Sequence, residues 1–249
     1  MPRVFVDGDV VIYRAAQHAE TICDWGDDLW SIAADMREGR GHYVCAIAEI
    51  ARDLNVSRKD VTVCVSCKGP TFRHDLLPAY KANRTSRKPL IFHALRDWTV
   101  EQGAIRWDHL EADDVMGILG TRHRDSIIVT IDKDLKSVPG MHWNPDKKEQ
   151  GVVTVTEEEA DFFFYTQAIA GDSTDNYKGV PGMGMVRAAR LLEKEGPSWE
   201  TVLGAYKKSE LPESEALLNA RMARILRCSD WNEDTESVKL WEPYENLSA

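Results

Sequence analysis

Val4-Phe5-Val6-Asp7-Gly8-Asp9 opens the chain with a short apolar run that ends in an acidic turn. Two further runs of this kind end at a polar residue: Val61–Val65 before Ser66, and Ile127–Ile131 before Asp132. Short, continuously apolar, β-branched runs are typical of buried parallel strands. Helical patterns lie between them, at residues 43–54, 90–102 and 113–120. The alternation predicts an α/β domain whose ligand site lies beyond the carboxyl ends of the strands.

The pattern changes near residue 160, after a fourth strand-like run at residues 152–155. Helical patterns then follow one another, at residues 161–170, at 185–194 and onward to about 227. We therefore predict three parts: a sheet domain over residues 1–160, a helical domain over 161–230 and an acidic tail over 231–249.

Composition excludes several classes of protein. Apolar residues make up 43% of the 249 residues, which is a globular content rather than a disordered one. No apolar run approaches the roughly 18 residues of a membrane span, and no signal-peptide pattern opens the chain. The five cysteines include one CxxC pair, Cys64 and Cys67, and the sequence has no second CxxC pair. We therefore do not expect a zinc ribbon. We expect the cysteines to be unpaired thiols without a role in a reducing cytoplasm.

Charge is unevenly distributed along the chain. The net charge of −10 by itself argues against a nucleic-acid partner. From residue 68 to residue 96, however, the chain has seven Lys and Arg residues and a single acid, Asp75. Near-uniform positive charge in an acidic protein favours phosphate contacts over a merely solvated helix face. Tyr80, among these basic residues, is a candidate for stacking on a base.

Much of the acidity lies in four tight groups of carboxylates. Two groups follow predicted strands, one opens a predicted helix and one lies in a loop between helices: Asp7 with Asp9, Asp132 with Asp134, Glu111 with Asp113 and Asp114, and Asp172 with Asp175. Any one group has an ordinary explanation as a helix cap or a solvated turn. Carboxylates converging on one sheet edge would instead repel unless hard cations neutralised them. Mg²⁺ or Mn²⁺ fits oxygen ligands, and two such ions about 4 Å apart can activate a water and stabilise a leaving oxygen.

A glycine-rich loop, Gly179-Val180-Pro181-Gly182-Met183-Gly184, joins two predicted helices. It lacks the GxxxxGK[ST] pattern and a preceding strand, so it is not a nucleotide-binding P-loop. Glycines allow close approach to a partner, and the next helix, with Arg187 and Arg190, offers backbone N–H groups to a phosphate. A tight turn between helices explains the spacing equally well.

Together these pieces resemble the 5′→3′ exonuclease and flap endonuclease family, especially its bacteriophage members. The resemblance runs from Val4 to about Arg227 and rests on four pieces in the family's order. They are Val6–Asp9, Phe72-Arg73 with Tyr80–Arg84, Glu111–Asp114 with Ile131–Asp134, and Gly171–Asn176 with Gly179–Gly184.

The resemblance implies a PIN-like α/β domain with a central, mostly parallel sheet and a helical arch at about residues 72–100. A helix–three-turn–helix domain would follow. It gives eight residues the role of divalent-metal ligands, direct or through water: Asp7, Glu111, Asp113, Asp114, Asp132, Asp134, Asp172 and Asp175. The role of Asp9 is left open.

The same resemblance assigns the contacts with nucleic acid. Lys81 and Arg84 would act at the scissile phosphate, and Arg73 would support phosphate near the metals. The loop from Gly182 to Gly184, with Arg187 behind it, would hold duplex backbone and a monovalent cation such as K⁺. One departure stands out: many members carry an Asp where this chain has Ser66, so one metal ligand is expected to be missing.

We therefore expect a monomeric, cytoplasmic, Mg²⁺- or Mn²⁺-dependent 5′→3′ exodeoxyribonuclease from a bacterial or phage-infected cell. It would use two metal ions, act on duplex DNA with a free 5′ end or flap, remove RNA primers from RNA/DNA hybrids and have no membrane partner. Three alternatives stay open: a PIN-like RNA-specific nuclease, a phosphatase built on Asp7-Gly8-Asp9, and a non-catalytic duplex-binding protein. The glycine loop argues against the first two, and the retained carboxylates against the third.

Overall fold

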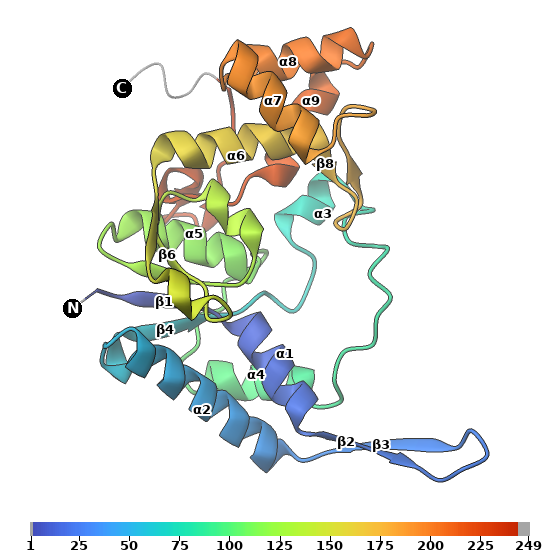
Figure 1. Cartoon of the computed structure of the whole chain (residues 1–249), viewed down its shortest axis with the longest axis vertical. Helices are drawn as coiled ribbons and strands as arrows, with labels where there is room; N and C mark the ends of the chain where they lie inside the picture. Colours follow the sequence, from blue (N-terminus) through green and yellow to red (C-terminus); the bar gives the residue numbers. More distant parts are fainter. Residues whose placement is uncertain (1, 244–249) are drawn as a thin grey trace.

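A five-stranded sheet organises the first part of the chain in the computed structural model, which describes residues 2–243 (Figure 1). Its strand order is β4-β1-β5-β6-β7. The strands are β1 (Val4–Asp7), β4 (Val61–Cys64), β5 (Ile127–Val129), β6 (Gly140–Trp143) and β7 (Val153–Val155). The first four are parallel and β7 is antiparallel to β6. The predicted mostly parallel sheet is confirmed. Strand β6 was not predicted, because its sequence, Gly-Met-His-Trp, lacks the apolar, β-branched pattern that indicates a strand.

Helices cover both faces of the sheet, as the alternation of side chains along β1 requires. Val4 and Val6 pack on one face against α1 (Gly8–His18), α2 (Met36–Asp53) and α4 (Phe92–Glu101). Phe5 faces the opposite side and packs with α5 (Ala112–Arg122). These two apolar clusters hold β1 at the centre of the domain, so Asp7 at its end lies 6% exposed beneath the site described below.

The helices of the second part form their own layer at one end of the molecule (Figure 1). They are α6 (Glu157–Ala170), α7 (Met185–Glu195), α8 (Trp199–Lys208) and α9 (Glu213–Ala223). Phe164, Leu192 and Tyr206 lie at the centre of their core. Helix α6 begins at its Thr156 cap, whose hydroxyl accepts from Glu159 N, so the domain boundary that we predict near residue 160 falls inside a continuous helix.

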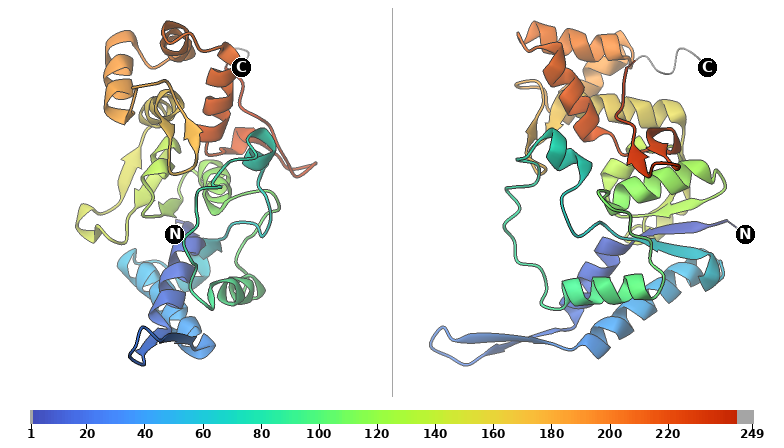
Figure 2. Two further views of the ribbon diagram at one scale, coloured as in Figure 1. Left: turned by 90° about the vertical axis from the view of Figure 1, so that its right-hand side faces the viewer. Right: turned by 180° about the vertical axis from the view of Figure 1, so that it is seen from behind.

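The segment expected to form a helical arch is mostly not helical. After the short α3 (Phe72–Leu76), the chain crosses the molecule as turns and extended backbone and reaches α4 at residue 92. Figure 2 shows the middle of this segment, residues 77–91, standing away from the body of the protein, whereas Tyr80 and Ile91 near its two ends are buried. Its polar sequence has no apolar stripe to bury, and Pro78 and Pro89 interrupt helix formation at its two ends. We call residues 77–91 the strap.

A two-stranded hairpin that the sequence analysis did not predict connects α1 to α2. Its strands are β2 (Glu20–Asp24) and β3 (Trp30–Ala34), and they pair antiparallel along their whole length. Figures 1 and 2 show the hairpin extending away from the rest of the chain.

The C-terminal segment, which we predicted as an acidic tail, packs on the rest of the protein as far as residue 243. Beyond the short pair β10 (Trp231–Asn232) and β11 (Ser237–Val238), Trp241 is buried in the core of the helical layer. Trp231 packs in the core beneath the sheet. Residues 244–249, which the tail prediction also covers, lie outside the described residues. No helix within residues 2–243 is long and apolar enough to cross a membrane.

Candidate active site

Asp7 lies buried at the carboxyl end of β1, where the charges of Asp9 and Asp132 act on it. It caps α1, because Val10 N donates to its Oδ1 at 3.3 Å, and Thr130 Oγ1 lies 3.4 Å from its Oδ2. The next position requires a glycine, because a Cβ on Gly8 would meet the Cys64 carbonyl of β4 at 2.6 Å. The motif Asp7-Gly8-Asp9 thus turns the chain from strand to helix directly above the sheet edge.

Ser66, in the position where a carboxylate was expected, connects two parts of the site. Its backbone N–H donates to Asp9 Oδ2 at 3.3 Å, and its hydroxyl accepts from Ala112 N at 3.0 Å. Ser66 therefore caps the first turn of α5, the helix that presents Glu111 and Asp113. The other oxygen of Asp9 is buried without a hydrogen-bond partner among the described residues.

Asp132 and Asp134 follow β5, as the sequence predicts. Thr130 orients this turn, since its hydroxyl accepts from Asp132 N at 3.0 Å while it lies against Asp7. Asp132 in turn accepts from Asp134 N at 2.8 Å. Thr130 is a site residue that our reading of the sequence missed; its position at a strand end, two residues before Asp132, was the available signal.

Asp172 and Asp175 come from the other layer. They lie on the turn between β8 (Gly171–Asp172) and β9 (Tyr177–Lys178), which packs against the end of α6. The backbone is tightly crossed here, because a Cβ on Gly171 would meet Gly179 N at 2.1 Å. This close crossing points the turn toward α5 and the strap.

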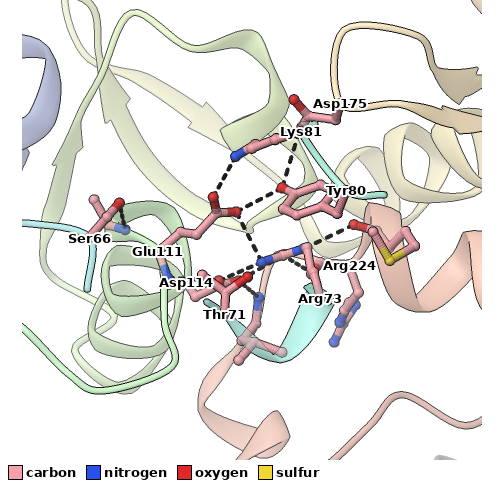
Figure 3. A network of polar contacts seen from close by, with 12 residues as sticks. Ser66, Thr71, Arg73, Tyr80, Lys81, Glu111, Asp114, Asp175 and Arg224 are labelled. Atoms are coloured by element: carbon pink, nitrogen blue, oxygen red, sulfur yellow. Dashed lines mark hydrogen bonds and ion pairs between the residues drawn. The ribbon is translucent and has the colours of Figure 1, made fainter. Parts of the chain in front are cut away.

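The strap places its cations directly over the acids. Lys81 pairs with Glu111 (Figure 3) and lies 3.7 Å from Asp175. Arg84 also pairs with Asp175. The backbone holds this arrangement, since Lys81 N donates to Asp175 O at 3.0 Å. Two asparagines that the sequence analysis did not single out add to it: Asn83 donates to Ser173 O and Asn176 to Ala79 O.

The acids and the strap enclose one cleft of about 880 Å³. Six of the eight predicted metal ligands line it: Glu111, Asp113, Asp132, Asp134, Asp172 and Asp175. Lys81 and Arg84 line it as well, and so does Gly184 from the glycine loop. The tertiary structure therefore brings together carboxylates from the sheet domain and from the helical layer, with cations above them.

Asp114 is placed differently from the expectation. It is fully buried, and its two oxygens accept from Arg73 at 2.6 and 2.9 Å. Glu111 N and Leu226 N also donate to it. No oxygen of Asp114 remains free for a cation, so its carboxylate joins α5 to the chain after α9 rather than facing the cleft.

Arg73 is the other half of this buried pair. Its guanidinium donates to Asp114, to Glu111 and to the carbonyls of Met222 and Arg224 (Figure 3). These contacts use all five of its N–H groups. An Arg with no donor left does not bind phosphate, so this structure corrects the phosphate-supporting role expected for Arg73.

The structure also differs from the expectation that Tyr80 stacks on a base. Its ring is 4% exposed and belongs to the core of the helical layer. Its hydroxyl lies 2.8 Å from Glu111 Oε2 and 3.1 Å from Asp175 Oδ2 and donates to one of them at a time. Tyr80 thus fixes the distance between two acids of the cleft.

The glycine loop begins α7 beside the cleft. Gly182 adopts a φ of +73°, and its carbonyl accepts from Arg187 at 2.9 Å. Gly184 is the N-terminal cap residue of α7, and Arg187 and Arg190 are exposed on that helix. The loop therefore offers a helix N-terminus at the cleft, with two exposed cations further along the same helix.

Crowding of the acids is reflected in their protonation. Burial and the neighbouring charge of Asp9 raise the pKa of Asp7 to about 7. Burial and the charge of Asp132 raise the pKa of Asp134 to about 6. Glu111 is the opposite case: burial opposes its ionisation, but Arg73 and Lys81 outweigh it and lower the pKa to about 2. The floor of the site thus holds more negative charge than its own surroundings neutralise.

The donor set fits a hard divalent cation. Asp9 and Asp134 each have a buried carboxylate oxygen without a hydrogen-bond partner among residues 2–243, and such oxygens are costly unless a cation takes them. Within the same residues, no three acidic, His or Cys side chains already stand together as a complete metal site. A bound cation would therefore complete its coordination with water, as Mg²⁺ commonly does.

Comparison with known proteins identifies the family. Residues 3–161 match the family model for the 5′-3′ exonuclease N-terminal resolvase-like domain. This chain belongs to the 5′-3′ exonuclease family. It is therefore a nuclease, and the predicted fold class and direction of action, 5′ to 3′, are confirmed.

Phage proteins of this family match over nearly their whole length. The exodeoxyribonuclease of Enterobacteria phage T3 and the exonuclease of Escherichia phage T7 are each 26% identical over 96% of this chain and 92% of theirs. Among solved structures, the 5′-exonuclease of phage T5 with bound zinc superposes with a TM-score of 0.64 over 90% of this chain and 89% of that one. At 18% identity, this match supports the fold alone.

Proposed function

We propose that this 5′-3′ exonuclease hydrolyses DNA from free 5′ ends in the cleft beneath the strap, with divalent cations held by the carboxylates there. One observation carries the proposal: acids from both layers converge under Lys81 and Arg84, and one of them, Asp134, has a buried oxygen with no hydrogen-bond partner among the described residues. The names of the phage T3 and T7 relatives support DNA as the substrate. The T5 D15 protein co-crystallised with metal ions supports metal dependence.

The metal set that we propose is smaller than the sequence suggested. Asp7, Asp113, Asp132 and Asp134 would hold one cation from the sheet side, and Glu111, Asp172 and Asp175 would contribute toward a second, while Asp114 is left out. The preferred ion is Mg²⁺, or Mn²⁺, because the ligands are oxygens. When bound, such cations supply Lewis-acid stabilisation of phosphate oxygens and lower the pKa of water.

The chain's own residues account for the rest of the reaction. Lys81 and Arg84 stand above the acids, where they would stabilise the charge that builds on the phosphate during in-line attack by water. Tyr80 would hold Glu111 and Asp175 at a fixed distance. The N-terminus of α7, with Arg187, would hold duplex backbone, and the carbonyls of the Gly182–Gly184 loop would take K⁺.

The decisive experiment uses duplex, gapped and flapped DNA labelled at either the 5′ or the 3′ end, with Mg²⁺ or with EDTA. We expect 5′ label to be released in small products with Mg²⁺ only, with 5′ flaps and RNA primers as further substrates of the monomer. Asp132→Asn should abolish release and keep DNA affinity. Release from the 3′ end, metal-independent cutting, or cleavage of RNA alone would overturn the proposal.

A further inference from the structure

The β2–β3 hairpin carries large apolar side chains that face solvent. Those exposed by 38 to 67% are Ile22, Trp25, Leu29, Trp30 and Ile32. Within the described residues, none of them belongs to any of the three apolar clusters of the fold. The views in Figures 1 and 2 show no other element packed on either face of the hairpin. Several large apolar side chains exposed together on one element, and unused by the fold, are typical of an interaction site.

The hairpin is built to hold these side chains in place. At its tip, Trp25 N donates to Leu29 O at 2.9 Å, and Gly26 supplies the turn with a φ of +80°. The indole of Trp25 donates to Ser31 Oγ at 2.9 Å. A rigid surface loses little conformational entropy on binding. This hairpin would therefore bind a partner more tightly than a flexible loop of the same composition.

Strand pairing divides the exposed apolar residues between two faces, with three of the five on one face. Ile22 lies opposite Ile32, and Asp24 lies opposite Trp30, so these side chains share a face of the hairpin. Trp25 and Ser31 interact on the other. The first face is thus a row of two isoleucines and a tryptophan that ends beside the acidic tip. Aromatic and aliphatic residues in such a row are the usual anchors of protein interfaces.

Charge decides what kind of partner fits. From residue 15 to residue 36 the chain has five acids and no Lys or Arg, and Asp24, Asp27 and Asp28 surround the tip. Nucleic-acid surfaces require cations, so DNA is disfavoured here. A second copy would bring the same acids against themselves. The complementary surface is an apolar groove with a basic rim.

We propose that the β2–β3 hairpin is a docking site for another protein, one that presents an apolar groove bordered by Lys and Arg. Ile22, Trp30 and Ile32 enter the groove, and the aspartates of the tip pair with its rim. The base of the hairpin also contacts the strap. The Glu20 carboxylate accepts two hydrogen bonds from the Arg87 guanidinium, each at 2.8 Å, and one from Leu90 N at 2.6 Å. The partner would therefore be held beside the end of the strap that carries Arg87.

The test uses full-length protein as bait and two variants. Trp30→Ser with Ile32→Ser removes the apolar face, and Asp27→Asn with Asp28→Asn removes charge at nearly constant shape. Val152→Ser with Val153→Ser is the matched control, because these valines are also exposed, elsewhere in the chain. Proteins from the native cell that the parent retains and the apolar-face variant loses are identified, expressed alone and titrated against each purified bait at two salt concentrations.

We expect one purified partner to bind the parent and the control equally and to bind the apolar-face variant at least tenfold more weakly. The charge variant should bind more weakly and with less dependence on salt. All baits should melt alike and cut DNA equally without the partner. The proposal is overturned if no protein is lost by the variant, if a purified candidate binds every bait equally, if the variant instead loses DNA affinity, or if it loses self-association in sedimentation.

Discussion

At the scale of single residues, burial separates the acids that face the cleft from those that hold the chain together. Asp113 and Asp114 are neighbours on α5, yet Asp113 lines the cleft and Asp114 is fully buried against Arg73. A one-residue step on a helix turns a side chain by about 100°, which is enough to move it from the cleft to the core. Motif identity alone does not distinguish these two roles.

Arg73→Met should destabilise the fold far more than it weakens DNA binding. It would leave Asp114 buried without its partner, which costs about 3–5 kcal/mol. Adding Asp114→Leu should recover part of that loss, because both charges are then gone. Urea unfolding measures both effects; normal stability of Arg73→Met together with weak DNA binding would restore the phosphate-contact role.

Ser66→Ala should lower stability by about 1 kcal/mol, since Ala112 N loses its capping acceptor. Ser66→Asp would retain an acceptor at the first turn of α5 and add charge beside Asp9. We therefore expect Ser66→Asp to melt lower than the parent with EDTA, to gain more from Mg²⁺, and to reach full activity at lower Mg²⁺. Superimposable Mg²⁺ titrations of parent and variant would place residue 66 outside the metal site.

Metal-free protein should lose stability as pH rises from about 4 to about 7. The pKa of Asp7 is raised from 3.8 to about 7 by burial and by Asp9, so in this range the folded state keeps a proton that the unfolded state has released. Melting in EDTA across this range, compared with Asp7→Asn, isolates the effect: the variant should show a shallower slope. Mg²⁺ should stabilise the parent most at the upper end, and equal slopes for the two proteins would contradict the assignment.

At the scale of elements, the strap works by its anchors rather than by regular structure. Its backbone is tied to the β8–β9 turn through Lys81 N and the side chain of Asn83. Its other end is tied to the hairpin through Arg87 and Glu20. A segment without helix thus still presents two cations at a defined place, because hydrogen bonds at both ends fix its path.

Lys81→Ala should lower the cleavage rate by about 10²–10³ and change duplex affinity by less than about tenfold, because a cation at the reacting phosphate acts mainly in the transition state. Lys88→Ala is the matched control: Lys88 is also in the strap, but its ammonium lies over the Phe92 ring and it does not line the cleft. Single-turnover cleavage and equilibrium binding separate the two effects. A parallel fall in rate and affinity would make Lys81 a general phosphate contact.

At the scale of the whole molecule, the chain returns to its own first half. Ile225, Leu226 and Trp231 follow the last long helix and pack in the core beneath the sheet. A Cβ on Gly117 of α5 would meet Leu226 O at 2.3 Å, so the returning chain lies directly on that helix. The two layers are therefore parts of one cooperative structure as well as two sides of the cleft.

Residues 1–160 expressed alone should fail to fold cooperatively, because they lack the returning segment and the partners of Arg73. The complete chain should unfold in one transition. Calorimetry and urea titration of both proteins test this, with a chain ending at residue 243 as the control that keeps every described contact. A sharp transition in residues 1–160 would show instead that the sheet domain is independent.

From the sequence alone we could predict the strands β1, β4 and β5, the acids that follow β1 and β5, and the family, because each of these depends on local apolar runs and ordered motifs. The sequence analysis missed β6 and the hairpin, whose strands lack a distinctive local pattern. It also could not show that Asp114, Arg73 and Tyr80 are buried while Asp113 and Lys81 are not. That distinction depends on contacts with residues more than 60 positions away, such as Arg224 and Asp175, and only tertiary packing decides which of two adjacent polar groups keeps its access to water.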